Sequence, residues 1–163
     1  MERDVKPIPE GYRTITPFLA VHDAAKAIDF YKEAFGAEER YRMTLPDSEC
    51  VAHAELKIGD SVIMLSDEMP GQSCEPSALG ESCTGFYRYV NDVDSVFERA
   101  IAVGAKVKDP LKDQFWGDRV GQIIDPAGHI WSLATHIEDV SPEELRRRGK
   151  EMFEKMLQGA GRP

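Results

Sequence analysis

Two polar residues, His53 and Glu55, lie two positions apart in a stretch whose other members are mostly apolar. Alternate residues of a β-strand point to the same side, so a strand here would present both side chains on one face. The opposite face, which would pack against a helix, consists of Ala52, Ala54, Leu56 and Ile58. A carboxylate beside an imidazole can orient the ring and raise its pKa, which suits a general base. The spacing therefore predicts either a catalytic pair that points into a cleft or a polar pair on the wet face of a half-buried sheet.

The segment 114–119, Gln-Phe-Trp-Gly-Asp-Arg, gathers two aromatic rings, a carboxylate and a guanidinium between two expected strands. Trp116, Asp118 and Arg119 could form a recognition loop in which the planar guanidinium binds a carboxylate or a phosphonate. The alternative is a surface ion pair between Asp118 and Arg119, with aromatic rings that close one end of the fold. His136 shares the strand parity of Ser132, so it either lines the same cleft or marks the end of its strand.

Several familiar catalytic patterns are absent from the sequence. It contains no Gly-rich phosphate loop, no nucleophile elbow and no His-Glu-x-x-His zinc motif. His53, Glu55 and His136 could together form a metal site, but no closely spaced pair of His or Cys residues supports it.

Composition restricts the classes of function. The chain has 163 residues, of which 42% are hydrophobic and 30% charged, and a net charge of −9 at pH 7. The negative charge argues against nucleic acid and against an anionic membrane surface as partners. No apolar run approaches the ~20 residues of a membrane span, and the polar N-terminus lacks a signal-peptide core, so a cytoplasmic location is expected. Cys50, Cys74 and Cys83 are predicted to be free thiols, with a Cys74–Cys83 bridge as the alternative.

The chain contains an internal repeat. A shift that places Leu65 on Leu133 also places Gly36-Ala37 on Gly104-Ala105. Each copy has the pattern of a strand, a helix and three strands, which predicts an α+β protein of two βαβββ units. The expected organisation is an arm at 1–12, a first module at 13–66, a linker or loop at 67–83, a second module at 84–137 and a C-terminal helical extension at 138–163.

Hydrophobic periodicity, caps and breakers predict the position of each element. In the first module we expect strands at 13–21, 39–45, 51–58 and 61–66, and a helix that Asp23 caps and Gly36 ends. In the second module we expect strands at 84–90, 106–112, 120–124 and 130–136, and a helix between Asp92 and Gly104. A capping box that begins at Ser141 predicts a final helix to about residue 157.

Two motifs within this repeat carry a resemblance to a known family. Residues 28–36, Ile-Asp-Phe-Tyr-Lys-x-x-Phe-Gly, and 125–128, Asp-Pro-x-Gly, resemble the vicinal oxygen chelate superfamily of glyoxalases, bleomycin-resistance proteins and extradiol dioxygenases. The resemblance covers residues 13–137, and the segment 131–136 with the acidic residues after it is similar to a PhnB-like, glyoxalase-related subgroup. It implies two cupped sheets that form an incomplete mixed β-barrel around a cleft, with flanking helices, and a homodimer.

The enzymes of this superfamily hold a divalent metal in the cleft, with His, Gln or Glu ligands from the first and last strands of each unit. Carried over by position, these ligands fall on Thr16, Met64, Gly85 (or Thr84) and Ser132. None of these side chains is a competent ligand for Zn²⁺, Ni²⁺ or Fe²⁺. The resemblance therefore implies the fold without a metal at the usual position, and no cofactor is expected.

The residues expected to line the ligand-binding cleft are Thr16, Phe18, Met64, Trp116, Asp118, Arg119, Ser132 and His136. The function that this arrangement favours is metal-free binding of a small molecule, as in the bleomycin-resistance relatives. One alternative is a lyase or isomerase that is metal-independent, or has a relocated metal, and uses His53 and Glu55. A second alternative is a structural or regulatory dimeric module whose C-terminal helix is the interaction surface.

Overall fold

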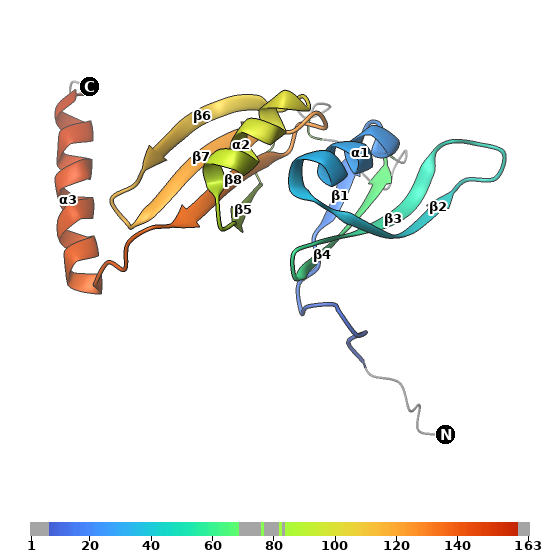
Figure 1. The fold of residues 1–163 in the computed structure, drawn as a ribbon, viewed down its shortest axis with the longest axis horizontal. Coiled ribbons are helices and arrows are strands. Elements are labelled where there is room, and N and C mark those ends of the chain that lie inside the picture. Colours follow the sequence, from blue (N-terminus) through green and yellow to red (C-terminus); the bar gives the residue numbers. More distant parts are fainter. Residues whose placement is uncertain (1–6, 69–75, 77–81, 83, 160–163) are drawn as a thin grey trace.

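The computed structural model describes residues 7–68, 76, 82 and 84–159. In this part of the chain, two four-stranded mixed sheets and three helices form an α+β fold, and neither sheet closes into a barrel (Figure 1). Each sheet belongs to one strand-helix-strand-strand-strand module, in agreement with the repeat. Residues 1–6 of the predicted arm and most of the predicted linker lie outside the described residues, as do Cys74 and Cys83, whereas Cys50 is a free thiol.

The first module comprises β1 (Phe18–Val21), α1 (Ala24–Phe35), β2 (Glu38–Thr44), β3 (Val51–Ile58) and β4 (Ser61–Asp67). Its strands lie in the order β1-β4-β3-β2, with β1 parallel to β4 and the other pairs antiparallel. The helix α1 begins as predicted, because the Asp23 carboxylate accepts a hydrogen bond from the Lys26 amide. It ends at Gly36, whose φ of 66° is in the left-handed region that favours glycine.

The second module comprises β5 (Gly85–Tyr89), α2 (Val93–Ala102), β6 (Lys106–Asp113), β7 (Asp118–Ile124) and β8 (Ile130–His136). Its sheet has the equivalent order β5-β8-β7-β6, again with one parallel pair, β5 and β8. Asp92 caps α2 by accepting a hydrogen bond from the Ser95 amide. Pro110 lies in the edge strand β6, where the register shifts, as expected for a residue that cannot donate to a sheet.

Two strand boundaries differ from the prediction by more than one residue. The strand β1 begins at Phe18 rather than at residue 13, so Thr16 precedes the strand instead of belonging to it. Pro17 lacks an amide hydrogen and contributes only its carbonyl, which accepts a hydrogen bond from the Met64 amide. The strand β7 begins at Asp118 rather than at residue 120, because a tight turn at 114–117 returns the chain earlier. Asp118 and Arg119 are therefore consecutive strand residues that point to opposite faces, not members of one loop.

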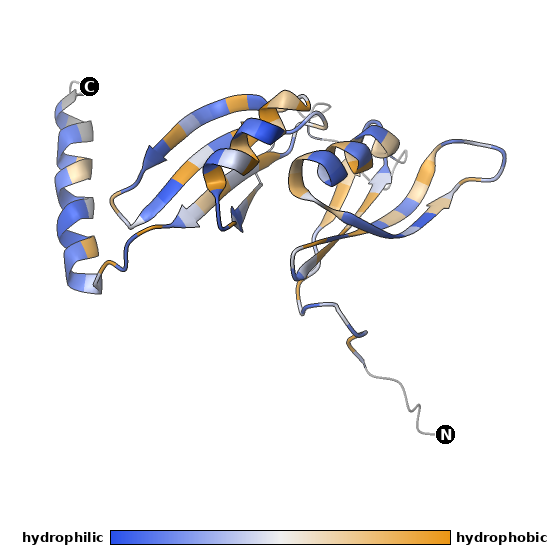
Figure 2. Cartoon of the chain, viewed as in Figure 1, coloured by the Kyte–Doolittle hydropathy of each residue, from blue (hydrophilic) through white to orange (hydrophobic). Residues whose placement is uncertain are grey.

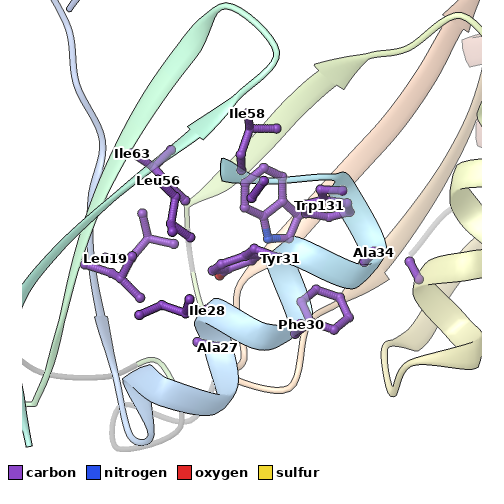
Figure 3. Close-up of a cluster of buried hydrophobic side chains, with 14 of the residues drawn as sticks. Leu19, Ala27, Ile28, Phe30, Tyr31, Ala34, Leu56, Ile58, Ile63 and Trp131 are labelled. Atoms are coloured by element: carbon purple, nitrogen blue, oxygen red, sulfur yellow. The ribbon is translucent and has the colours of Figure 1, made fainter. Parts of the chain in front are cut away.

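One hydrophobic core joins the two modules, and α1 lies at its centre (Figure 3). The buried Tyr31 and Phe35 of α1 contact Trp131 of β8, with ring centroids 5.7 Å and 4.9 Å apart. The Tyr31 hydroxyl and the Trp131 indole both donate to the buried Asp125 carboxylate, at 2.6 Å and 2.9 Å. The Asp-Pro-Ala-Gly turn at 125–128 thus forms a polar contact between the two modules within the apolar core.

The third helix, α3 (Pro142–Gly159), lies beyond the second sheet, at the opposite end of the molecule from the first module (Figure 1). Ser141 caps it, because its hydroxyl accepts a hydrogen bond from the Glu144 amide. Arg148 joins the helix to the loop after β8 through two hydrogen bonds to Glu138, at 2.7 Å and 2.8 Å. Hydrophilic residues predominate along α3 (Figure 2). No helix in the described part of the chain has the length and hydropathy that a membrane span requires.

Candidate functional site

Each sheet has one face that packs on its own helix and an opposite face that does not, which we call the open face. Strand register and alternation place the following among the residues on the open face of the first sheet: Phe18, Tyr41, His53, Glu55 and Met64. By the same argument the open face of the second sheet carries Tyr87, Tyr89, Asp118, Ser132 and His136. The predicted candidate residues therefore fall into two groups, one in each module, and no hydrogen bond or ring contact between described residues joins the two groups.

In the first group, the Glu55 carboxylate lies between an imidazole and a phenol. His53 Nε2 is 3.3 Å from Glu55 Oε1, and the Tyr12 hydroxyl donates to Glu55 Oε2. The hydrogen bond from Tyr12 is the largest cause that lowers the pKa of Glu55, and the bond with His53 adds to it against the opposing effect of burial. The His53 ring also lies 6.2 Å from the ring of Phe18. Both members of the predicted pair are thus on the open face, and Glu55 is held in its ionised form.

The second group is organised around the Asp118 carboxylate, which is only 2% exposed. Its Oδ2 atom accepts hydrogen bonds from the hydroxyls of Tyr87 and Tyr89, at 2.9 Å and 2.8 Å, and from the Trp116 indole at 3.1 Å. Its Oδ1 atom lies 2.8 Å from His136 Nδ1. A carboxylate that accepts four hydrogen bonds has its acceptor sites filled, so it orders these four side chains.

The electrostatics of this group favour an ionised Asp118. Burial raises the pKa of Asp118, but the hydrogen bonds from His136, Tyr89, Tyr87 and Trp116 outweigh burial and leave the pKa below its ordinary value. The same contacts act in the opposite direction on the donors. Burial is the largest cause that raises the pKa of Tyr87, whereas the hydrogen bond to Asp118 is the largest for Tyr89.

His136 lies between two carboxylates. Its Nδ1 atom faces Asp118, and its Nε2 atom lies 3.0 Å from an Asp139 carboxylate oxygen. Because an ionised carboxylate can only accept, hydrogen bonds to both carboxylates at once require both ring nitrogens to donate, which only the protonated ring can do. The hydrogen bonds to Asp118 and then Asp139 raise the pKa of His136 above its ordinary value. The two partners differ in burial, since Asp118 is buried and the Asp139 side chain is fully exposed.

The turn before β7 positions Trp116 and Asp118. Gly117 has a φ of +97°, and a Cβ atom there would lie 2.1 Å from the Glu138 carbonyl oxygen. The Gly117 carbonyl accepts hydrogen bonds from the amides of Ile137 and Glu138, at 2.9 Å and 3.0 Å. Only glycine combines this backbone conformation with so close an approach. The turn and the loop that carries Asp139 are thereby held against each other.

Two predicted site residues, Arg119 and Thr16, do not join these groups. Arg119 points to the helix side of the sheet, where it pairs with Asp94 of α2 at 2.7 Å and with Asp113 at 3.0 Å. It is therefore placed away from Asp118, contrary to the recognition loop that the sequence suggested. Thr16 precedes β1 and lies outside both groups, whereas Met64, the register neighbour of Phe18 and Glu55, belongs to the first group.

The sequence prediction missed Tyr87 and Tyr89, which flank Arg88 on β5. The alternation of these two tyrosines on an expected strand was a usable signal, because the parallel register pairs Tyr87 with Ser132. It also missed Tyr12, which lies in a segment without strand or helix pattern, where no periodicity could have placed it.

The positions that hold metal ligands in the superfamily's enzymes can be tested against this register. Met64 of β4 pairs with Phe18 of β1, and Ser132 of β8 pairs with Tyr87 of β5. The register therefore places Phe18 and Tyr87 beside Met64 and Ser132, where the sequence had placed Thr16 and Gly85. With either pair of residues, the thioether of Met64 and the hydroxyl of Ser132 do not form a donor set for Zn²⁺, Ni²⁺ or Fe²⁺. Across the described ranges, no cluster of three or more His, Cys, Asp or Glu side chains has a geometry that could hold a metal ion. The residues at these positions do not fit the superfamily's metal.

A cavity of about 410 Å³ lies where the two modules meet, beside the second group. Ile58 and Ile63 line it from the first module, and Phe86, Tyr87, Tyr89 and Trp131 line it from the second. The Arg88 guanidinium also borders it; its Nη2 atom donates to the Phe35 carbonyl, and its buried Nη1 atom has no hydrogen-bond partner among the described residues. The tyrosines of the second group therefore border both the open face and this cavity.

Comparison with known proteins agrees with this architecture. The Mycobacterium bovis protein Mb0911c is 43% identical over 136 residues, which cover 81% of this chain and 89% of its relative. The crystal structure of TioX from Micromonospora sp. ML1 matches with a TM-score of 0.61 and 31% identity, over 77% of this chain and 99% of TioX. A PhnB protein from Bacillus cereus shares the fold, with a TM-score of 0.60 and 21% identity over 76% of this chain and 99% of that protein.

The sequence profile of one family matches residues 14–133, which run from before β1 into β8 and so cover the first module and nearly all of the second. That match, the paired βαβββ topology and the structural neighbours agree with one another. The chain belongs to the Glyoxalase/Bleomycin resistance protein/Dioxygenase superfamily.

Proposed function

We propose that the protein binds a small organic molecule on the open face of its second sheet, without the divalent metal of the superfamily's enzymes, and that it does so as a homodimer. The observation that carries this proposal is the Asp118 carboxylate, buried to 2% exposure yet bonded to four side chains whose other surfaces remain accessible. An ionised carboxylate is costly to bury unless its oxygens are fully hydrogen-bonded. The fold supplies those hydrogen bonds to Asp118, although an apolar side chain buried at this position would need none.

What the carboxylate achieves is a fixed arrangement of aromatic rings. The rings of Tyr87 and Tyr89 lie 5.2 Å apart, and the two side chains remain 47% and 61% exposed. Rings that are already held in place lose little conformational freedom when a ligand packs on them, which improves affinity. The adjoining cavity of about 410 Å³ falls within the range of ordinary small-molecule pockets. These features support recognition of a flat, partly apolar molecule.

Exposed apolar side chains on the first sheet support the homodimer. Phe18, Tyr41 and Met43 are each about half exposed on or beside its open face. Large apolar side chains exposed on one face of a sheet are candidates for an interface or a binding face. If the open face of the first sheet in one copy covered the open face of the second sheet in another, both surfaces would be buried and the ligand enclosed. Sedimentation velocity should then give a dimer that Phe18→Glu dissociates and Val107→Glu, on the exposed edge strand β6, does not; a monomeric wild type would contradict this part of the proposal.

The first experiment on the binding proposal has two steps. Protein prepared without a metal-affinity tag should contain substoichiometric metal and bind equally well after treatment with EDTA. A panel of aromatic carboxylates, aromatic thiols and phosphonates should then contain a compound that stabilises the stripped protein. At a hundredfold excess over its Kd, a ligand adds about 2.7 kcal/mol, which raises the Tm of a domain of this size by roughly 5–10 °C. Tyr89→Ala should abolish the shift, and Val107→Ala should leave it unchanged. Binding that requires added Mn²⁺, Ni²⁺, Zn²⁺ or Fe²⁺, or no binder at all, would contradict the proposal.

A second candidate function rests on the contact between His53 and Glu55. A neutral imidazole beside an ionised carboxylate could accept a proton from a substrate, as in a metal-independent lyase or isomerase. The 3.3 Å separation and the second bond from Tyr12 to the same carboxylate favour an oriented pair. Once a substrate is known, His53→Ala should lower kcat by a factor of at least about 100. An unchanged rate would exclude catalysis by His53 and leave small-molecule binding as the one proposed function.

A further inference from the structure

The contact between His136 and Asp139 has an unusual asymmetry. The inner nitrogen of the ring is fixed by the buried Asp118 carboxylate at 2.8 Å. The outer nitrogen, Nε2, donates instead to Asp139, whose side chain is fully exposed and has no other hydrogen-bond partner among the described residues. Asp118 therefore orients the ring, whereas Asp139 occupies the Nε2–H donor, which would otherwise face solvent beside the aromatic rings.

We propose that His136 Nε2–H is the recognition point for a carboxylate on the ligand, and that Asp139 occupies this position when no ligand is present. The inference rests on the proposed function and specifies its ligand class: a planar aromatic carboxylate. The acidic group would bind His136, and the ring system would lie against Tyr89 and Tyr87. These three side chains converge on one Asp118 carboxylate, so a single small molecule can reach all of them.

Exchange of one carboxylate for another conserves the charge of the site. Asp118 compensates the imidazolium from inside the sheet, and Asp139 adds a second negative charge from outside. When a ligand carboxylate displaces Asp139, the total charge around His136 stays the same. A neutral or cationic ligand would instead leave the His136 ring with one fewer negative charge beside it. The displaced Asp139 returns to water that it already contacts, and exposed ion pairs of this kind contribute little, so the exchange costs little.

The charged groups around His136 indicate how the site responds to pH. Asp118 of β7 and Asp139 of the loop after β8 face the ring directly, and Tyr87 and Tyr89 of β5 face the shared carboxylate. Both carboxylates favour the protonated ring. Loss of the Nε2 proton removes the donor, so affinity for a carboxylate should fall as the pH rises through the elevated pKa of His136.

The test compares 2-naphthoate with its neutral isostere 2-naphthamide by isothermal titration calorimetry on the full-length chain. Wild type should bind the carboxylate at least about tenfold more tightly than the amide, because the charge-assisted hydrogen bond is absent from the amide. Asp139→Ala should tighten naphthoate binding several-fold and leave naphthamide unchanged, whereas Asp29→Ala on the exposed side of α1 should change neither. His136→Gln should bind the two probes equally, and the preference of wild type should disappear at high pH.

Each other outcome has a definite meaning. Equal affinity of wild type for the two probes, or weaker naphthoate binding by Asp139→Ala, would overturn this inference and leave the proposed binding function standing. Absence of binding for both probes would overturn the inference, while other members of the ligand panel continue to test the proposed function. Because Asp139 and Asp29 are exposed, neither alanine variant puts the fold at risk, so the result does not depend on the stability of His136→Gln.

Discussion

Tyr31→Phe tests whether the two modules fold as one unit. The Tyr31 side chain is fully buried in α1, and its hydroxyl donates to Asp125 of the second module at 2.6 Å. The substitution removes one hydrogen bond to a charged acceptor and leaves Asp125 with the Trp131 indole and two backbone amides as donors. Hydrogen bonds to charged groups contribute about 1.5–3 kcal/mol, so the free energy of unfolding should fall by about 2 kcal/mol. Phe occupies the same space, so no cavity term adds to this value.

The assay is equilibrium unfolding in urea, followed by far-UV circular dichroism and tryptophan fluorescence. With a slope of about 2 kcal/mol/M, a loss of about 2 kcal/mol lowers the midpoint by about 1 M. Tyr41→Phe is the matched control, because the Tyr41 hydroxyl makes no hydrogen bond to any described residue and its side chain is half exposed. A change below about 0.5 kcal/mol in Tyr31→Phe, the size expected for an ordinary surface substitution, would contradict a stabilising hydrogen bond between Tyr31 and Asp125. Two separate transitions in wild type would refute the shared core.

Three further predictions concern the site. Gly117→Ala should destabilise the protein by at least about 2 kcal/mol, because its φ of +97° is strained for alanine and its Cβ would meet the Glu138 carbonyl oxygen; urea unfolding measures this, and a neutral result would contradict the close approach. Asp118→Asn should lower the pKa of His136 towards its ordinary value, which a proton NMR titration of the imidazole detects; an unchanged pKa would mean that the contact is absent in solution. The pKa of Glu55 is depressed in the folded state, so its contribution to stability is present above the ordinary carboxyl pKa and is lost as pH falls through the folded value; Tyr12→Phe should weaken this acid dependence, and an identical profile would argue against the contact.

The sequence predicted the fold well where local signals were strong. The aspartate caps at Asp23 and Asp92 and the glycine at Gly36 act within one turn of chain, and the structure places the helices where these signals put them. The strand β3 has the predicted bounds, because its alternation of apolar and polar residues matches the period of a half-buried strand. Its open-face pair, His53 and Glu55, follows from the same alternation.

The candidate site was predicted only in part, because it depends on pairings between distant strands. Asp118 and Arg119 were assigned to one loop, and the earlier start of β7 places them on opposite faces. The contact of Asp118 with Tyr87 requires the parallel register of β5 and β8 together with the antiparallel register of β7 and β8. No local pattern specifies that combination. The early start of β7 depends in turn on the approach of Gly117 to the loop after β8, which is also a long-range contact.

Metal-free binding at the Asp118 group is tested most directly by a two-dimensional ¹⁵N–¹H NMR titration of EDTA-treated protein with 2-naphthoate. Binding at the Asp118 group should give saturable shifts that cluster on the amides of Tyr87 and Tyr89 and on the indole of Trp116, with no requirement for added metal. Shifts confined to other surfaces, or shifts that arise only after a divalent metal is added, would contradict metal-free binding at the Asp118 group.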